Sequence, residues 1–198
     1  MNQALLIFKR NRPRVYRLLD SVNLIYLFSG KINLVKIKQE RYLKLIYDIF
    51  KVIDEKFNLT SFAIYGSVAR GTAKKTSDVD ILIISDDFKG SLASRIDELL
   101  NLDGSIESEL SWLRDKGIYT SLSFYSLKCT EAEKIPLIFL DLVEDAKIIY
   151  DKEGFLKNIL LSLKLKLKRL KAERIWLDKD KWIWDLKPDF KPMELIEI

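Results

Sequence analysis

Two short apolar runs joined by a glycine-bearing turn constrain the fold of this chain more than any other feature. Residues 61–65 and 79–84 are rich in apolar and β-branched side chains, a pattern typical of buried β-strands. The first run ends at Gly66-Ser67, and residues 68–70 can begin a helix. A second turn region, residues 71–77, leads into the second run. The arrangement predicts a mixed α/β fold in which both runs belong to the sheet.

The polar residues at the ends of these two runs are of the types that bind a metal-bound triphosphate. Gly66 lets the backbone approach a phosphate closely, the following helix N-terminus presents free N–H groups, and Ser67 adds a hydroxyl. Asp78 and Asp80 stand at i and i+2, which puts both carboxylates on one face of a strand. Because adjacent carboxylates repel each other unless a cation lies between them, the pair predicts a site for a hard divalent cation. An ordinary turn would explain Gly66-Ser67 alone, and a solvated strand start would explain the two aspartates alone. Neither explains why both occur together at this spacing.

This segment resembles the nucleotidyltransferase superfamily of DNA polymerase beta, and within it the minimal nucleotidyltransferases. Their signature is Gly-Ser, ten residues and then Asp-x-Asp, which Gly66-Ser67, residues 68–77 and Asp78-Val79-Asp80 match. The resemblance covers about residues 42–150. It implies the nucleotidyltransferase fold, a short mixed sheet with helices packed on one side. The tail around residues 182–189 is similar to that of archaeal members.

The resemblance implies Mg²⁺-dependent (or Mn²⁺-dependent) transfer of a nucleoside monophosphate from a nucleoside triphosphate to a hydroxyl acceptor. It assigns six residues to the site: catalytic and metal-binding Asp78 and Asp80, and nucleotide-binding Gly66, Ser67, Arg70 and Ser77. Arg70 can contact phosphate or pair with a surface acid. The acceptor stays open among a protein side chain, an RNA end and a small molecule.

One element of the family pattern is missing. The third carboxylate of the family lies on the following strand, here residues 118–125, which contain no Asp or Glu and carry Ser121 or Ser123 in its place. The chain is therefore expected to turn over slowly or not at all, and the alternative is a nucleotide-binding regulatory or partner module that has lost catalysis. Three acids further along could replace the missing one, although capping or surface roles explain them more simply: Asp141, Glu144 and Asp145.

Periodic patterns organise the rest of the chain around this motif. Apolar residues recur at helical spacing in 42–57, 91–101 and 106–116, whereas 118–127 and 146–150 favour strands. The chain divides into three predicted parts: an N-terminal arm at 1–36, a nucleotidyltransferase domain at 37–150, and a C-terminal helix and aromatic tail at 151–198.

The two ends of the chain are harder to interpret. The basic N-terminal arm is expected to form a helix near 18–26 and then an extended piece at 32–37. Residues 155–176 show one helical face, although 163–168 alternate as a strand does, and length favours the helix. The tail beyond residue 178 is expected to lie as an aromatic strap with its tryptophans largely buried, because exposed tryptophans are costly.

Composition excludes several classes of site. The chain has no histidine and one cysteine, Cys129, so it can form neither a Ser-His-Asp triad, nor a histidine-ligated zinc site, nor an internal disulfide. The formal net charge of +5 suits anionic partners such as nucleotides or nucleic acid, or simply solubility, and Lys74 and Lys75 are expected in a solvated loop. No apolar stretch is long enough to span a membrane and no signal peptide is recognised, so a cytoplasmic location is expected, with a protein partner or homo-oligomer left open.

Overall fold

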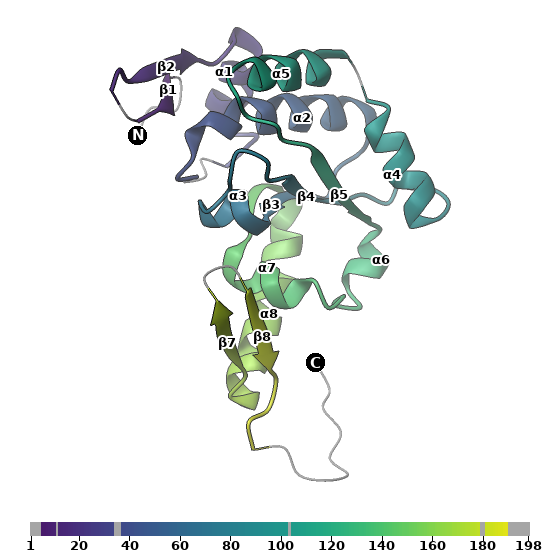
Figure 1. Ribbon diagram of the computed structural model, residues 1–198. Coiled ribbons are helices and arrows are strands. Elements are labelled where there is room, and N and C mark those ends of the chain that lie inside the picture. Colours follow the sequence, from purple (N-terminus) through teal and green to yellow (C-terminus); the bar gives the residue numbers. More distant parts are fainter. Residues whose placement is uncertain (1–4, 11, 34–36, 103, 179–180, 190–198) are drawn as a thin grey trace.

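A four-stranded mixed sheet forms the centre of the computed structural model, which describes residues 5–10, 12–33, 37–102, 104–178 and 181–189 (Figure 1). The strand order is β5-β4-β3-β6. The strands are β3 (Ser61–Tyr65), β4 (Val79–Ile84), β5 (Leu122–Leu127) and β6 (Lys147–Asp151). β3 runs antiparallel to β4 and β6, whereas β4 and β5 are parallel. The predicted mixed α/β fold is confirmed, and the third strand lies beside the strand that follows Asp78.

Helices cover both faces of this sheet, so the expectation of helices on one side is wrong. Phe62 and Ile64 of β3 face a core that includes helix α2 (Leu43–Lys56), while Ala63 between them faces a second core. The second core is built with α7 (Phe139–Asp145) and α8 (Phe155–Leu170). The reason lies in the central strands, whose side chains are apolar on both faces and therefore need cover on both.

The remaining helices connect the strands. They are α1 (Ser21–Phe28), α3 (Gly66–Arg70), α4 (Leu92–Leu100), α5 (Gly104–Asp115) and α6 (Cys129–Ala132), with short 3-10 turns at η1 (Glu40–Tyr42) and η2 (Lys152–Gly154). Because β4 and β5 are parallel, their connection has to cross the sheet, and α4 and α5 form that crossover. The helices predicted at 42–57, 91–101 and 106–116 are confirmed, with boundaries shifted by a few residues.

The N-terminal arm begins with a hairpin that the sequence patterns did not reveal. Strands β1 (Leu5–Lys9) and β2 (Val15–Leu18) pair antiparallel, and α1 follows, capped by the Asp20 side chain, which accepts from the Asn23 backbone N–H at 2.9 Å. Leu18, predicted in the helix, belongs to β2. Much of the extended piece predicted at 32–37 lies outside the described residues. Leu6 is buried in the same core as α2, so the arm packs on the domain.

The C-terminal helix is shorter than predicted. α8 ends at Leu170, and Lys171 takes a left-handed conformation with φ 58°. Strands β7 (Glu173–Asp178) and β8 (Lys181–Asp185) then form an antiparallel hairpin beside α8 (Figure 1). The helical apolar stripe stops at Leu167, and the β-branched and aromatic residues after it favour a strand. The tryptophans at 182 and 184 lie mostly buried against the body of the protein, as expected, whereas Trp176 of β7 is 52% exposed.

Candidate nucleotide and metal site

Gly66 and Asp80 are brought together by the register of β3 and β4. Tyr65, the last residue of β3, pairs with Asp80, so the next residue along the chain meets the Asp80 side chain. Gly66 has φ +67°, and a Cβ built on it would lie 2.0 Å from Asp80 Oδ2. Only glycine fits this position, because any other residue would be strained and would collide with the carboxylate. The motif glycine therefore leaves room for an acid at the start of helix α3.

Two serines of the neighbouring strand complete the surroundings of the acids. The Ser121 hydroxyl donates to Asp78 Oδ1. Ser123 pairs with Asp80 in the parallel register and its hydroxyl hydrogen-bonds the Asp80 carboxyl. The serines thus lie where the missing carboxylate of the family pattern was expected, as the sequence predicted.

The electrostatics of Asp80 suit a cation. Burial raises the pKa of the Asp80 carboxyl above its ordinary value, and the Asp78 carboxylate raises it further; the bond from Ser123 and the charge of Arg70 oppose both effects. A carboxylate whose charged form is destabilised in this way is stabilised by a divalent ion between it and its neighbour. Within the described part of the chain, no cluster of three acids or other metal-binding residues is present. The candidate donor set is the pair Asp78 and Asp80, whose carboxylate oxygens are of the type that hard divalent cations prefer.

The other three residues assigned by the sequence lie around this pair. Ser67 stands in the first turn of α3, where its carbonyl accepts from the Thr72 N–H at 2.9 Å. The Ser77 hydroxyl accepts from the Lys74 N–H at 2.8 Å and shapes the loop before Asp78. Arg70 donates from Nη1 to Asp145 Oδ2 at 3.2 Å, so it pairs with an acid of α7, the second of its two predicted roles.

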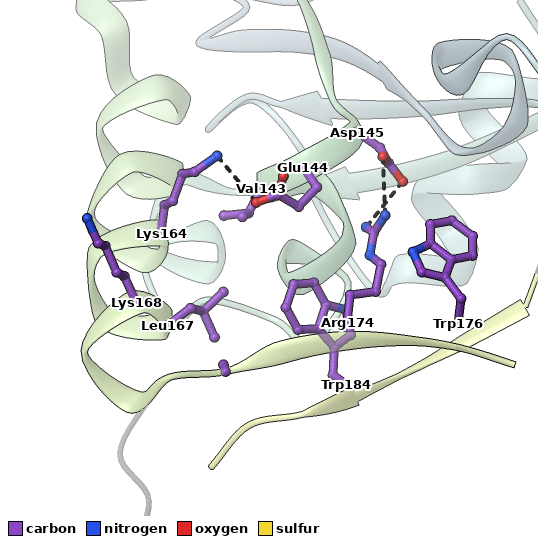
Figure 2. A pocket seen from close by; sticks show the side chains of 10 residues that line it. Val143, Glu144, Asp145, Lys164, Leu167, Lys168, Arg174, Trp176 and Trp184 are labelled. Atoms are coloured by element: carbon purple, nitrogen blue, oxygen red, sulfur yellow. Dashed lines mark hydrogen bonds and ion pairs between the residues drawn. The ribbon is translucent and has the colours of Figure 1, made fainter. Parts of the chain in front are cut away.

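The C-terminal hairpin reaches the motif through this Arg70–Asp145 pair. Arg174 of β7 donates to the same carboxylate, from Nη2 at 3.2 Å, and Figure 2 shows it between Trp176 and Trp184. The Trp182 ring of β8 lies 4.7 Å from the guanidinium carbon of Arg70. Sequence reasoning missed this connection. The sequence clue was the spacing of two residues within each strand, 174 and 176 in one and 182 and 184 in the other. Side chains two residues apart lie on the same face of a strand, so all four lie on one face of the hairpin.

The three acids considered as replacements for the missing carboxylate all have other partners. Asp141 Oδ1 accepts from the indole N–H groups of Trp182 at 2.8 Å and Trp184 at 3.0 Å. Glu144 pairs with Lys164 at 3.3 Å across the cavity in Figure 2. With Asp145 held by two arginines, the simpler structural roles describe this group best.

Two tyrosines that the sequence did not single out lie on this side of the sheet, Tyr65 near Asp80 and Tyr125 near Tyr65. Burial raises the pKa of Tyr65 to about 12, and the charges of Asp80 and Tyr125 add to the shift. The clue was positional: Tyr65 directly precedes the motif glycine, and Tyr125 stands two residues after Ser123 on the same face of β5. The Tyr65 phenol therefore stays neutral at physiological pH beside the acid.

Comparisons with known proteins were made for the whole sequence. Residues 46–197 match the nucleotidyltransferase domain family. A protein of Methanocaldococcus jannaschii named "Putative protein adenylyltransferase MJ1305" is 33% identical over 145 residues, which are 72% of this chain and 93% of the relative.

Two solved structures are also similar. A toxin-antitoxin crystal structure with AMP-PNP matches with a TM-score of 0.40 at 18% identity, over 64% of this chain and 93% of that chain. The toxin-antitoxin MntA-HepT matches with a TM-score of 0.38 at 14% identity, over 64% of this chain and 87% of that chain.

Among the residues that the structure describes, no helix has the length and apolarity needed to cross a membrane.

Proposed function

Because this chain belongs to the nucleotidyltransferase domain family, we propose that it transfers the adenylyl group of Mg²⁺-bound ATP to a hydroxyl acceptor. The observation that carries the proposal is the contact between Gly66 and Asp80. It sets a carboxylate, paired with Asp78, against the glycine at the start of α3, where backbone N–H groups can receive phosphate. The choice of ATP rests on the name of the M. jannaschii relative.

In this reaction the acceptor oxygen forms a bond to the α-phosphorus, the bond to the bridging oxygen of the β-phosphate breaks, and pyrophosphate leaves. Asp78 and Asp80 would hold the Mg²⁺, which when bound neutralises the triphosphate and aligns it for in-line attack. Gly66 and Ser67 would receive the phosphates, with Ser77 at the edge of the site. Arg70 would stay on Asp145 and act on Asp80 only through its charge.

The serines beside the acids limit the rate. A hydroxyl is a poor base, and loss of a general base typically costs about 10²–10⁴-fold in rate. Ser121 and Ser123 are also the observation that favours the second candidate, a nucleotide-binding module without significant catalysis. The relative's name points to a protein side chain as the acceptor; an RNA end and a small molecule are the other two candidates.

The test is transfer of α-labelled ATP to the chain itself, to other proteins, to RNA and to small hydroxyl compounds. Slow transfer is expected from the natural chain, and Ser123→Asp should accelerate it because a carboxylate then stands next to Asp80. Ser123→Asn is the matched control, since it is similar in size and cannot act as a base. Equal transfer by the natural chain and by Asp78→Asn/Asp80→Asn would show that the site is assigned wrongly.

A further inference from the structure

A strongly basic cavity lies on the side of the motif loop away from the C-terminal hairpin. It has a volume of about 570 Å³ and is bounded by β1, residues 38–41, Lys75 and residues 116–118. One carboxylate, Glu40, lines it together with six cationic side chains: Lys9, Arg10, Lys38, Arg41, Lys75 and Lys116. The net charge of the lining therefore equals the formal net charge of the whole chain, +5. The rest of the molecule is balanced, and the excess is gathered at one concave site.

Most of this charge is uncompensated. Within the part of the chain that the structure describes, none of the four lysines has a carboxylate within 4.0 Å; they are Lys9, Lys38, Lys75 and Lys116. Glu40 lies 3.7 Å from Arg10 and also accepts from the Ile7 N–H at 2.8 Å. Clustered like charges repel each other, so the cavity is more stable when an anion enters it.

The cavity is fixed to the motif loop by several contacts. The Gln39 side chain brackets Ala73, donating to its carbonyl at 2.8 Å and accepting from its N–H at 3.2 Å. The Tyr42 hydroxyl donates to the Lys74 carbonyl at 3.2 Å. A Cβ added to Gly71 would lie 2.8 Å from the Lys38 side chain, so the two segments touch. Residues 38–42 thus hold the loop that leads to Asp78.

The same contacts place the cavity close to the acids. The Lys75 carbonyl accepts from the Tyr119 N–H at 2.7 Å. Asp78 stands three residues after Lys75, and Ser121 stands three residues after Ile118 of the cavity wall. The Ser121 hydroxyl donates to Asp78, so both chain segments lead from the cavity to the acid. Three residues of extended chain span at most about 11 Å. A chain-like anion in the cavity can therefore extend its end to Asp78.

Part of the cavity wall lies before the residues that match the family and part lies within them. Its β1 and 38–41 walls precede residue 46, where the match to the nucleotidyltransferase domain begins. The segment before residue 46 supplies four of the cations, Lys9, Arg10, Lys38 and Arg41, and sets them beside the motif loop.

We infer that the basic cavity docks single-stranded nucleic acid and presents its end to Asp78 and Asp80 as the acceptor, an inference that rests on the proposed function. Six cations exceed what one phosphate group needs, whereas a strand supplies one phosphate for each nucleotide. Tyr119, which follows Ile118 of the cavity wall in the chain, is 61% exposed, and a base of a strand that extends beyond the cavity can stack on its ring. An aromatic platform beside a basic groove is the usual form of a single-strand site, and an acidic peptide would make no use of the ring.

Binding is tested by fluorescence anisotropy with a labelled single-stranded RNA about 10 nucleotides long, without nucleotide or divalent ion, at several salt concentrations. Lys9→Gln/Lys38→Gln/Lys116→Gln should weaken binding at least about 10-fold and reduce the salt slope by about 2, since each phosphate contact on a single strand contributes about 0.7. The Lys→Arg triple at the same positions should bind as the natural chain does. Tyr119→Ala should weaken binding about 10-fold through loss of stacking.

The control removes equal charge elsewhere. Lys89→Gln/Lys152→Gln/Lys157→Gln changes three exposed lysines outside the cavity and should leave both the affinity and the salt slope near those of the natural chain. Equal losses in the two glutamine triples would overturn the inference, as would an acidic peptide that binds as tightly as the RNA. In a separate transfer assay, label on another acceptor but none on the bound RNA would overturn the acceptor assignment while the proposed function stands. RNA binding without transfer to any acceptor would instead contradict the proposed function.

Discussion

Two clusters of cationic side chains flank the Gly66–Asp80 motif, and they differ in how their charge is compensated. In the hairpin cluster, defined as Arg70, Arg174, Asp141 and Asp145, each arginine has a carboxylate partner and lies against tryptophan rings. The cavity cluster is defined as the six cations that line the basic cavity. Its four lysines, Lys9, Lys38, Lys75 and Lys116, have no carboxylate partner among the described residues. The clusters lie toward opposite ends of the molecule, one with each terminal hairpin (Figure 1).

This difference in charge compensation indicates a structural role for the hairpin cluster and a binding role for the cavity cluster. Paired and partly buried arginines hold the C-terminal hairpin to α7 and α3, and their loss should cost stability. Unpaired lysines around a cavity contribute little to folding and are available to a ligand. The same residue type therefore has opposite consequences on the two sides of the motif, and three changes test that contrast.

The largest effect on stability is expected from Asp145→Asn in the hairpin cluster. This carboxylate receives both Arg70 and Arg174, and its own side chain is 11% exposed. Among the described residues, the change leaves Arg70 without a carboxylate partner and Arg174 with only Asp141, at 3.6 Å. The free energy of unfolding should fall by about 2–4 kcal/mol in urea denaturation. Glu144→Gln is the control, because its pair with Lys164 is 43% and 57% exposed and should contribute less than about 1 kcal/mol. Similar results from both variants would remove the distinction between paired and solvated charge.

A third buried cation, Arg95, sharpens the comparison through pH. Its guanidinium donates to Glu131 at 2.6 Å, and this bond is the main reason that the pKa of Glu131 is lowered from 4.5 to about 2. Since the folded-state pKa is below the unfolded value, the stabilisation is complete above about pH 4.5 and is lost as the pH falls toward 2. Glu131→Gln should therefore lower the free energy of unfolding by about 1–2 kcal/mol at pH 7, a modest figure because the Glu131 side chain is 37% exposed.

Urea denaturation of the natural chain and of Glu131→Gln at a series of pH values measures this difference. The difference in free energy of unfolding between the natural chain and Glu131→Gln should decrease steadily below pH 4.5. A gap that is constant from pH 7 to pH 3 would mean that Glu131 acts by packing and not by charge.

The smallest effect on stability is expected in the cavity cluster. Lys9→Gln/Lys38→Gln/Lys116→Gln should change the free energy of unfolding by no more than about 0.5 kcal/mol, because these lysines are exposed and form no ion pair with a described residue that the change would remove. Relief of repulsion among like charges can even give a slight gain. A loss comparable to that of Asp145→Asn would show that the cavity lysines are structural and that the contrast between the clusters is false.

The motif was predictable from sequence because its determinants are local. Gly66 directly follows β3 and Asp80 belongs to the adjacent β4, and one short helix joins the two strands, so strand alternation and spacing indicate that the two residues lie close together. Ser121 and Ser123 were expected beside the acids because both strands are apolar and the family pairs them, and the register confirms that the strands are neighbours.

What lies around the motif depends on contacts between distant segments. Arg174 reaches Asp145 from 29 positions away, and Gln39 reaches Ala73 from 34, and nothing in either local pattern indicates the partner. The end of α8 was misplaced because residues 173–178 form a strand only by pairing with residues 181–185, and the local pattern before them does not indicate that partner. The tryptophans at 182 and 184 are mostly buried as expected, but the acid that receives both indole N–H groups, Asp141, could not be identified from the local pattern.

The central claim is that Asp78 and Asp80 bind a metal-bound triphosphate beside Gly66, and calorimetric titration tests it most directly. The natural chain is titrated with a non-hydrolysable ATP analogue in the presence of Mg²⁺ and again in the presence of EDTA. We predict binding with Mg²⁺, at least about 10-fold weaker binding with EDTA, and a similar loss in Asp78→Asn/Asp80→Asn with Mg²⁺ present. Equal affinity in the natural chain and in the double variant, both with Mg²⁺, would contradict the account.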